Sequence, residues 1–318
     1  MPTSEADIGS SSLVICVATF RRPEGLRRLL AGVAAQSYRS RPRPRVRVIV
    51  VDNEASAETK ALCDASAKEL GLSLQYVAEP RTGIAYARNA ALAAVTPADE
   101  WICFIDDDEV PTAAWLDDLL ATQRETGAEC VAGKVIALFP PGTPRWITGG
   151  AYFGSKRART GVPVPPTSNS MISRAAVERL GLRFDTKFGA SGGEDTLFFR
   201  RAARGGVRTA WTEAAVVHEH VVPGRLRLSR VMRRQFREGG TLALCDLAMG
   251  ATWFEKAVRL AKGGGLLVLG ALTLPLCVVY GFDAFARAAC RLARGAGTLA
   301  GLAGVRFDEY RPDRNLDV

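Results

Sequence analysis

Short apolar runs alternate with amphipathic segments along the first third of the chain. The runs are rich in Val, Ile and Leu and have the length of strands buried on both faces, at residues 13–18, 46–51, 73–77 and 101–105. The segments between them repeat apolar residues at helical spacing and predict helices at 23–36, 57–70 and 84–95. Strands and helices that alternate in this way indicate an α/β fold with a mostly parallel sheet, right-handed crossovers and flanking helices.

The fourth apolar run ends abruptly in four acidic residues, Asp106, Asp107, Asp108 and Glu109. Unpaired carboxylates cost several kcal/mol or more inside a core. They are therefore expected at the carboxyl end of the strand, where open α/β sheets bind ligands. Carboxylates that face one space favour Mg²⁺ or Mn²⁺, which keeps open positions for substrate phosphates. The alternative is a solvated acidic loop, or a cap for a helix that starts near Pro111, with Asp108 or Thr112 as its N-cap.

Polar residues also follow the other strands. Thr19 and Arg21 follow the first run, and Asp52 and Asn53 end the second. We expect these groups to converge on one crevice with the acidic residues. There is no Gly-x-Gly-x-x-Gly after the first run and no P-loop motif in the chain, which argues against a dinucleotide oxidoreductase and a P-loop NTPase. A bound nucleotide would then be held by side chains and a metal.

Composition limits the binding partners and the cellular compartment that the protein can have. The 318 residues are 47% hydrophobic, as in globular proteins, and carry a formal charge of +9 that comes from arginine, mostly in the second half. A basic balance suggests phosphates, nucleic acid or an anionic membrane; without interleaved aromatics in a basic stretch, we expect no nucleic acid. Seven cysteines without a Cys-x-x-Cys pair fit reduced thiols in the cytoplasm. Residues 1–12 lack the basic start of a secretory signal and predict a disordered lead-in.

Two later stretches carry candidate contacts for a second substrate. Residues 131–170 are rich in Gly and Pro and predict a loop that frames an acceptor. In this loop Trp146 could stack on a sugar face, or it could anchor the loop to the core. Asn169, on a strand predicted at 167–173, could hydrogen-bond sugar hydroxyls. Gly193, which precedes Glu194 and Asp195, lets the backbone approach a ligand closely.

Seven segments taken together carry a family resemblance. They span about residues 13–223 and read VATFRRPE, VVDN, TGIAYARNAAL, FIDDDEVPTAAWL, TSNSMISR, GASGGEDTLFFRRA and VVHEHVVP. Their order and spacing resemble the inverting family 2 glycosyltransferases with the GT-A fold, most of all the glucosyltransferases of succinoglycan-type exopolysaccharide assembly. The resemblance implies a metal-dependent enzyme that uses a nucleotide sugar.

The resemblance also implies a role for each matching residue of the donor site. The nucleotide pocket would be lined by Thr19, Arg21, Asp52, Asn53 and Arg88. Asp106 and Asp108 stand at the acidic positions of the family's Asp-x-Asp motif. Asp108 would bind the metal directly, while Asp106 or Asp107 would meet the ribose and metal-bound water. For Arg88 the alternative is a surface arginine on a helix.

On the acceptor side, the resemblance implies that Asp195 removes the proton of the acceptor hydroxyl, with Glu194 as orienter or acceptor contact. The alternative is that both carboxylates only complement the N-terminal dipole of the helix that follows, a contribution of about 0.3–1 kcal/mol. Some GT-A enzymes use a histidine as third metal ligand, and His218 is the candidate. Strand alternation places His218 and His220 on the same face. The alternative to a metal ligand is that His218 has a structural role.

The character of the chain changes after Pro223. Six arginines between 225 and 237 indicate a basic helix that either is solvated or meets a lipid diphosphate or anionic headgroups. The stretch 263–282 is apolar without a charge and contains Pro275. We expect a membrane-associated helical hairpin over 251–304; the alternative is a buried packing or dimerisation helix. The chain then divides into a lead-in (1–12), a GT-A domain (13–224) and a basic, hydrophobic helical tail (225–318).

The expected activity is transfer of a hexose, with glucose expected, from a UDP-sugar to a lipid-linked oligosaccharide. It would take place at the cytoplasmic face of a bacterial inner membrane, in the synthesis of exopolysaccharide or another surface glycan. Three alternatives stay open. A sugar-phosphate nucleotidyltransferase would have a Gly-rich phosphate loop after the first strand, and a processive synthase would have several spanning helices and a Gln-x-x-Arg-Trp motif. A non-catalytic membrane scaffold would not need both Asp108 and Asp195.

Overall fold

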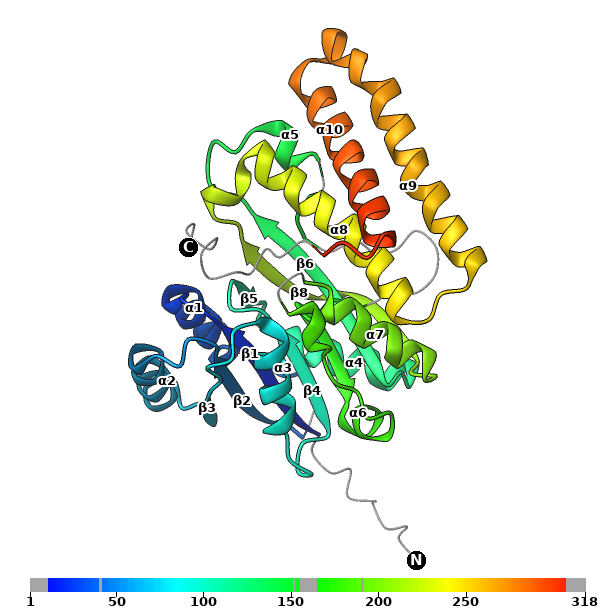
Figure 1. The fold of residues 1–318 in the computed structure, drawn as a ribbon. Helices are drawn as coiled ribbons and strands as arrows, with labels where there is room; N and C mark the ends of the chain where they lie inside the picture. The colour runs from blue at the N-terminus through cyan, green and yellow to red at the C-terminus, as the bar shows by residue number, and fades with distance from the viewer. Residues whose placement is uncertain (1–10, 40–41, 151, 155–164, 190–191, 307–318) are drawn as a thin grey trace, which may run out of the picture.

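One mixed sheet forms the centre of the protein. The computed structural model describes residues 11–39, 42–150, 152–154, 165–189 and 192–306. Within these residues eight strands lie in the order β3-β2-β1-β4-β7-β6-β8-β5 (Figure 1). Their bounds are Ser12–Thr19 (β1), Arg45–Asp52 (β2), Leu74–Ala78 (β3), Trp101–Ile105 (β4), Glu109–Pro111 (β5), Cys130–Leu138 (β6), Asn169–Ser173 (β7) and Thr209–His220 (β8).

The parallel half of the sheet agrees with the prediction, and the other half is mixed. Strands β3, β2, β1 and β4 run parallel, so their carboxyl ends meet at one edge, where Thr19 pairs with Asp52. Strand β7 is antiparallel to both of its neighbours, and β5 is antiparallel to β8. Because β7 begins where β4 ends, Asn169 lies opposite Ile105. The acidic residues therefore leave the sheet close to the start of β7.

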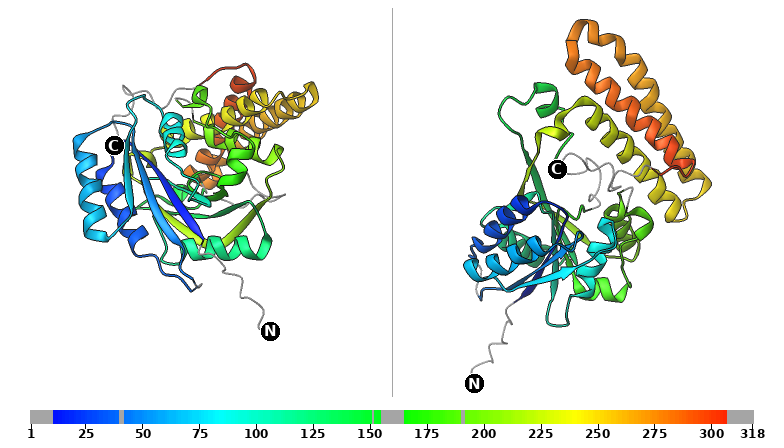
Figure 2. Two further views of the ribbon diagram at one scale, coloured as in Figure 1. Left: turned by 90° about the horizontal axis from the view of Figure 1, so that it is seen from below. Right: turned by 60° about the vertical axis from the view of Figure 1, so that its left-hand side comes forward.

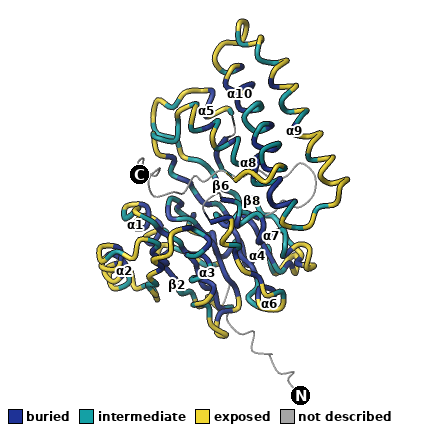
Figure 3. Tube along the Cα trace, in the orientation of Figure 1, coloured by how far each residue is buried: buried dark blue, intermediate teal, exposed yellow. Residues whose placement is uncertain are grey.

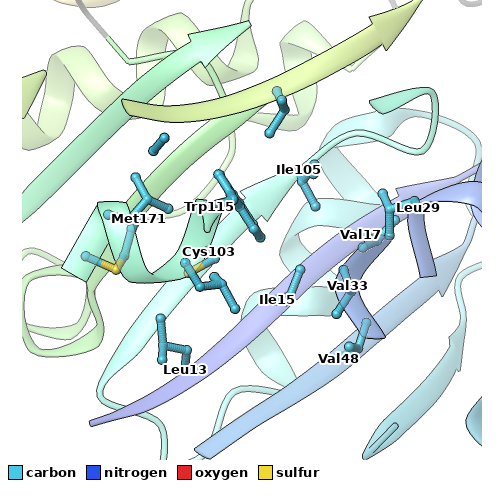
Figure 4. Packing of buried hydrophobic residues seen from close by; sticks show 14 of the residues in the cluster. Leu13, Ile15, Val17, Leu29, Val33, Val48, Cys103, Ile105, Trp115 and Met171 are labelled. Atoms are coloured by element: carbon cyan, nitrogen blue, oxygen red, sulfur yellow. The ribbon is translucent and has the colours of Figure 1, made fainter. Parts of the chain in front are cut away.

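Helices cover both faces of the sheet (Figure 2). One layer contains α1 (Pro23–Ala34), α2 (Ala57–Leu70) and α4 (Trp115–Thr126); the other contains α3 (Ile84–Ala93), α6 (Arg174–Arg179) and α7 (Glu194–Arg204). Strand β4 serves both layers, because Cys103 and Ile105 pack on the first and Ile102 and Phe104 on the second. Figure 4 shows the first layer, where Trp115 lies over Cys103 and Ile105. This accounts for the uninterrupted apolar character of the strand.

Local signals set several helix boundaries. Pro23 occupies the first turn of α1, and the Ser56 hydroxyl accepts a hydrogen bond from the Thr59 N–H at the start of α2. Gly71 ends α2 in the left-handed region at φ 64°, where a Cβ would be strained. Helix α4 begins at Trp115 rather than near Pro111, because Pro111 belongs to the short strand β5. The alternative in which Asp108 or Thr112 caps a helix that starts near Pro111 is therefore wrong.

The C-terminal part forms a helical arm beyond the sheet. It contains η2 (Pro223–Leu226), α8 (Leu228–Ala248), α9 (Trp253–Thr273), η3 (Leu274–Leu276) and α10 (Cys277–Leu302). Helix α10 returns between α8 and α9, and close approach depends on glycine: a Cβ on Gly297 would lie 1.9 Å from the Phe236 carbonyl oxygen. Figure 1 shows α9 and α10 projecting as a pair away from the sheet.

The arm confirms the predicted hairpin shape and corrects one detail. The apolar stretch 263–282 is not a single kinked span, since α9 ends at Thr273 and Pro275 lies in η3 at the turn. Large apolar side chains at the end of the hairpin are exposed, with Leu272 at 72% and Val278 at 88%, and Figure 3 colours much of this end as exposed. Against the described residues, the hairpin is therefore not a buried packing element.

Two smaller predictions concern the start of the chain and the cysteines. The lead-in predicted at 1–12 lies almost wholly outside the described residues, and Ser12 already belongs to β1. All seven cysteines are free, and six of them are buried. This agrees with the expectation of reduced thiols rather than a disulfide framework.

Candidate active site

A cavity of about 1060 Å³ opens where the parallel strands end. It lies between the strand ends on one side and helices α7 and α8 on the other. Its lining includes nine residues that the sequence predicted as donor, acceptor or catalytic groups: Thr19, Asn53, Arg88, Asp106, Asp107, Asp108, Gly193, Glu194 and Asp195. The convergence expected from the strand ends is thus present for most of the candidate residues.

The acidic residues after β4 make up the floor of the cavity. Asp107 accepts hydrogen bonds from the Thr19 hydroxyl at 2.9 Å and from Nη1 of Arg22 at 3.0 Å. The same guanidinium nitrogen lies 3.0 Å from Oδ2 of Asp108, and Nη1 of Arg225 lies 3.1 Å from that oxygen. Burial raises the pKa of Asp107 to about 6, and burial also raises the pKa of Asp106. The floor thus concentrates carboxylates that gain from a nearby cation.

A single arginine connects the floor to the start of α7. Arg88 on α3 is buried, donates to Oδ1 of Asp106 at 2.9 Å, and forms an ion pair with Oε1 of Glu194. The other oxygen of Glu194 is buried and has no hydrogen-bond partner among the described residues, and burial raises the pKa of this carboxyl to about 7. The alternative of a surface arginine is therefore wrong for Arg88. Its two ion pairs fix the acidic floor and the first turn of α7 relative to each other.

Asp195 is the more accessible member of the Glu-Asp pair. Its side chain is half-buried, and Oδ1 accepts hydrogen bonds from the Thr196 N–H at 2.6 Å and hydroxyl at 3.3 Å. Gly193 caps the helix at φ 97°, and a Cβ there would lie 2.3 Å from Cγ2 of Thr241 on α8. A glycine therefore lets α8 approach the two carboxylates closely.

Two residues predicted to line the nucleotide pocket lie elsewhere. Arg21 forms an ion pair with Glu54 at 2.7 Å, and its side chain is 53% exposed outside the cavity. Asp52 is buried and accepts hydrogen bonds from the backbone N–H groups of Glu54 and Ser56, at 2.9 and 2.8 Å, and from the Tyr76 hydroxyl at 3.1 Å. Asp52 therefore shapes the turn after β2 and is not on the cavity surface.

Asn53 lines the cavity but uses its amide within the protein. Its Nδ2 donates to the carbonyl oxygens of Glu79 and Arg81, at 2.8 and 2.7 Å, and its Oδ1 accepts from the Gly83 N–H at 2.9 Å. These bonds fasten the loop that leads into α3. Asn53 thus positions the helix that carries Arg88.

The predicted acceptor contacts at Asn169 and Trp146 are corrected by the structure. Asn169 is fully buried: its Oδ1 accepts from Nε1 of Trp115 at 2.8 Å, and its Nδ2 donates to the carbonyl oxygens of Lys134 and Ala215 at 3.1 and 2.9 Å. Trp146, on α5 (Arg145–Thr148), is 9% exposed and packs edge-on against Phe282 with ring centroids 5.7 Å apart. It anchors the loop, as the alternative expected, although to the helical arm rather than to the core of the sheet domain. Part of the loop around it, at 151 and 155–164, lies outside the described residues.

The predicted metal ligand His218 does not line the cavity. Strand β8 alternates, and Glu219 is the residue that faces the cavity, so His218 and His220 point to the opposite face. Arg225 lies 3.3 Å from Glu219. Glu219, Arg22 and Arg225 are site residues that sequence reasoning missed. The alternation of β8 could have indicated Glu219, whereas nothing in the local sequence distinguishes Arg22 and Arg225 from neighbouring arginines.

The donor groups on the floor fit a hard divalent cation. Among the described residues, no three His, Cys, Asp or Glu side chains are grouped as a ready-made ligand set. Mg²⁺, however, is usually held by one or two carboxylates together with waters and substrate phosphates. Asp106 and Asp108 provide such carboxylates at the cavity surface. Both are therefore suitable ligands for an ion that arrives with a nucleotide diphosphate.

Comparison with known proteins now decides the family. The model of glycosyl transferase family 2 matches residues 14–181. The chain belongs to this family. It is 36% identical over 306 residues to the succinoglycan biosynthesis protein ExoM of Rhizobium meliloti (strain 1021), and the match covers 93% of this chain and 94% of that protein. The resemblance drawn from the seven segments is thus confirmed, as is the link to exopolysaccharide synthesis.

Solved structures confirm the GT-A-like fold of this glycosyltransferase. The mannosyltransferase PcManGT from Pyrobaculum calidifontis, in complex with GDP-Man and Mn²⁺, superposes with a TM-score of 0.61 at 21% identity and covers 92% of this chain and 88% of that one. S. aureus TarS 1-349 in complex with UDP gives a TM-score of 0.53 at 16% identity, with 92% of each chain covered. At these identities the likeness concerns the fold alone.

Proposed function

We propose that this family 2 glycosyltransferase moves a hexose, specifically glucose, from a UDP-sugar to a lipid-linked oligosaccharide during exopolysaccharide assembly. One observation carries the proposal: the acidic floor after β4 and the Glu194–Asp195 pair line the same cavity, and Arg88 joins them through two ion pairs. A donor diphosphate and an acceptor hydroxyl both need to reach such a space. The shared cavity therefore suits transfer from one to the other better than a scaffold role.

The proposed reaction is a single in-line displacement at the anomeric carbon. Asp195 takes the proton of the attacking hydroxyl, a task that typically contributes about 10²–10⁴-fold to the rate. Asp108 and Asp106 would hold a divalent cation, which would supply charge neutralisation for the departing diphosphate. Thr19 and Arg22 keep Asp107 in place beside them. One displacement inverts the anomeric configuration, so an α-linked donor gives a β-linkage.

The relatives support the donor and the metal. TarS has been crystallised with UDP and with UDP-GlcNAc, and PcManGT with GDP-Man and Mn²⁺. These complexes agree with a nucleotide-sugar donor and a divalent cation for this chain. The match to ExoM supports a product in the succinoglycan class of polymers.

The hairpin of α9 and α10 supports a place at a membrane. By length and composition, the helical stretch Trp253–Leu302 contains a segment apolar enough to cross a bilayer. Charged residues, however, occupy the first half of α9 (Glu255, Lys256, Arg259 and Lys262) and the return arm from Asp283 onward. The uncharged end of the arm, at 263–282, turns back at η3, and the α9 part of it rises only about 16 Å. We propose that this end dips into one leaflet on the cytoplasmic side, since a bilayer core is about 30 Å thick.

Calorimetric titration of UDP into the purified protein, with and without Mn²⁺, tests the donor assignment. We expect metal-dependent binding in wild type that is lost in Asp108→Ala. Asp64→Ala is the matched control, because Asp64 is an exposed carboxylate paired with Lys60 on α2, away from the cavity. If folded wild-type protein does not bind UDP in any metal condition, the proposed donor is wrong.

A further inference from the structure

The far wall of the cavity has the opposite charge to its floor. Helix α8, with α10 behind it, contributes one glutamate and five arginines to the lining: Arg230, Arg233, Arg234, Arg237 and Arg294. The glutamate, Glu238, is shared between Arg234 at 3.1 Å and Arg294 at 3.3 Å. This arginine wall therefore carries a surplus of positive charge into the same space as the catalytic carboxylates.

Helical spacing arranges part of this wall as a stripe. Arg230, Arg234, Arg237 and Thr241 recur every three or four residues and share one face of α8, which is the face that lines the cavity. The opposite side of the helix packs closely against α10, since a Cβ on Gly239 would lie 2.1 Å from the Arg294 carbonyl oxygen. The arginine face of α8 is thus directed at a ligand space, whereas a merely solvated face would point away from the protein.

The stripe leads to the proposed catalytic base. Thr241, at its inner end, adjoins Gly193, two residues before Asp195. Eleven residues of α-helix separate Arg230 from Thr241, which corresponds to about 16 Å along the axis. A group held near Arg230 is therefore farther from Asp195 than one pyranose ring can span. That separation suits an acceptor whose anionic end and reacting hydroxyl are divided by an oligosaccharide.

We propose that the arginine wall binds the diphosphate of the lipid-linked acceptor, at a subsite separate from the donor diphosphate on the acidic floor. This inference rests on the proposed function and adds the chemistry by which the acceptor is recognised. Guanidinium groups pair with phosphate oxygens through charge-assisted hydrogen bonds, and several such groups on one wall favour a multiply charged anion. Carboxylates repel the donor diphosphate unless a metal ion lies between them. The arginines attract the acceptor diphosphate directly, so this subsite needs no metal.

Titration of inorganic pyrophosphate into metal-free protein, in EDTA, isolates this subsite. We expect wild type to bind pyrophosphate, and an excess of UDP not to displace it, because UDP binding at the floor requires the metal. Replacing Arg230 and Arg237 together with Gln removes two cations from the stripe and is expected to weaken binding by about tenfold for each arginine. Arg233→Gln is a single, exposed replacement for the case in which the double variant does not fold, with about a tenfold loss expected.

Arg227→Gln is the matched control. Arg227 is exposed one turn before Arg230, has the same charge and does not line the cavity. Its replacement is expected to leave pyrophosphate binding within about twofold of wild type, as for surface charges away from a site.

The outcomes separate this inference from its rivals. Displacement of pyrophosphate by UDP without metal would mean that the wall serves the donor, and unchanged binding in the Gln variants would mean that it serves no phosphate; either result overturns the inference. A third arm uses vesicles with and without anionic phosphatidylglycerol. Variants that lose only vesicle binding would assign the arginines to membrane headgroups instead. Failure of UDP to bind with Mn²⁺ would be a failure of the proposed function, whereas UDP binding without an additional pyrophosphate site would overturn only the acceptor subsite.

Discussion

The sheet domain and the helical arm distribute apolar and charged side chains in opposite ways. In β4 every apolar residue is buried between two helical layers, and the charges that follow it are drawn into a cavity. At the end of the α9–α10 hairpin, apolar side chains such as Val278 and Tyr280 are exposed. Both segments have the composition of a core. The difference teaches that the sheet removes its apolar surface from water internally, whereas the hairpin leaves its apolar surface exposed.

The largest effect is expected from a substitution that alters only the proposed chemistry of the sheet domain. Asp195→Asn keeps the shape of the side chain and removes its ability to accept a proton, so we expect kcat to fall by about 10²–10⁴-fold. Metal-dependent UDP binding and vesicle binding should persist, because neither uses this carboxylate. A transfer assay with membrane-extracted acceptor measures the loss, with Asp64→Asn as the control. Full polymer synthesis by the Asp195 variant would contradict its role as base and favour a scaffold.

The next largest effect is expected from substitutions at the end of the helical arm. Serine at Leu272, Val278 and Val279 removes three exposed apolar side chains from the hairpin end. Each contributes about 1.5 kcal/mol or more when buried, so vesicle binding should weaken by at least about a hundredfold while UDP binding is retained. Co-sedimentation with phospholipid vesicles measures this partition.

Leu260→Ser is the control for the direction of insertion. Leu260 is also exposed, but it lies among the charged residues of the first half of α9. If the hairpin enters the membrane by its turn end, Leu260 stays outside, and this variant should bind vesicles about as well as wild type. An equal loss from Leu260→Ser and from the changes at the hairpin end would mean that the arm lies flat along the membrane.

The smallest effect concerns a buried charge in the sheet domain. Burial raises the pKa of Glu194 to about 7, so between pH 4.5 and 7 the native protein binds a proton that the unfolded chain has released. Raising the pH through this window therefore lowers the contribution of Glu194 to the free energy of unfolding. Glu194→Gln lacks this titration, so its unfolding free energy minus that of wild type should become more positive from pH 5 to pH 8. Denaturant unfolding at both pH values measures the difference.

Other groups titrate in the same range, which is why the variant is compared with wild type at each pH. The pKa values of Asp99 and Asp246 are lowered by hydrogen bonds from arginines, so these carboxylates contribute stability that is lost toward acid pH. Their contribution cancels in the comparison. A difference between Glu194→Gln and wild type that stays constant, or that becomes more negative at pH 8, would contradict a raised pKa for Glu194.

Much of the sheet domain could be predicted because its signals are local. The four apolar runs match β1 to β4 within two residues, since a strand buried on both faces must be continuously apolar. The convergence of Thr19 and the acidic residues followed from the rule that parallel strands end at one edge. Arg88 was predicted from the family resemblance alone. The helix at Glu194 was likewise found from its acidic first turn. These features depend on neighbours in the sequence and on a general property of parallel sheets.

The misplaced residues have a different origin. Asn169 and Asp52 have polar side chains that suit a ligand, but the backbone groups that use their hydrogen bonds come from distant segments or from a turn that the sequence does not specify. His218 was proposed as a metal ligand from the family resemblance, but the orientation of β8 toward the cavity depends on its pairing with β5 and β6. A shift of one residue exchanges the two faces of a strand, so this choice required the tertiary structure.

The sequence alone determined the family, the strand-and-helix order and the presence of an acidic cluster, because these depend on short-range spacing and apolar periodicity. Only the tertiary structure decided that Arg88 joins the floor to the Glu194–Asp195 pair and that the arginines of α8 face the same cavity. Both facts bring together residues that are far apart in the chain, and burial and packing of whole helices set their distances. The exposed hairpin end needed both sources. Its apolar composition is visible in the sequence, whereas its lack of a packing partner among the described residues appears only in the fold.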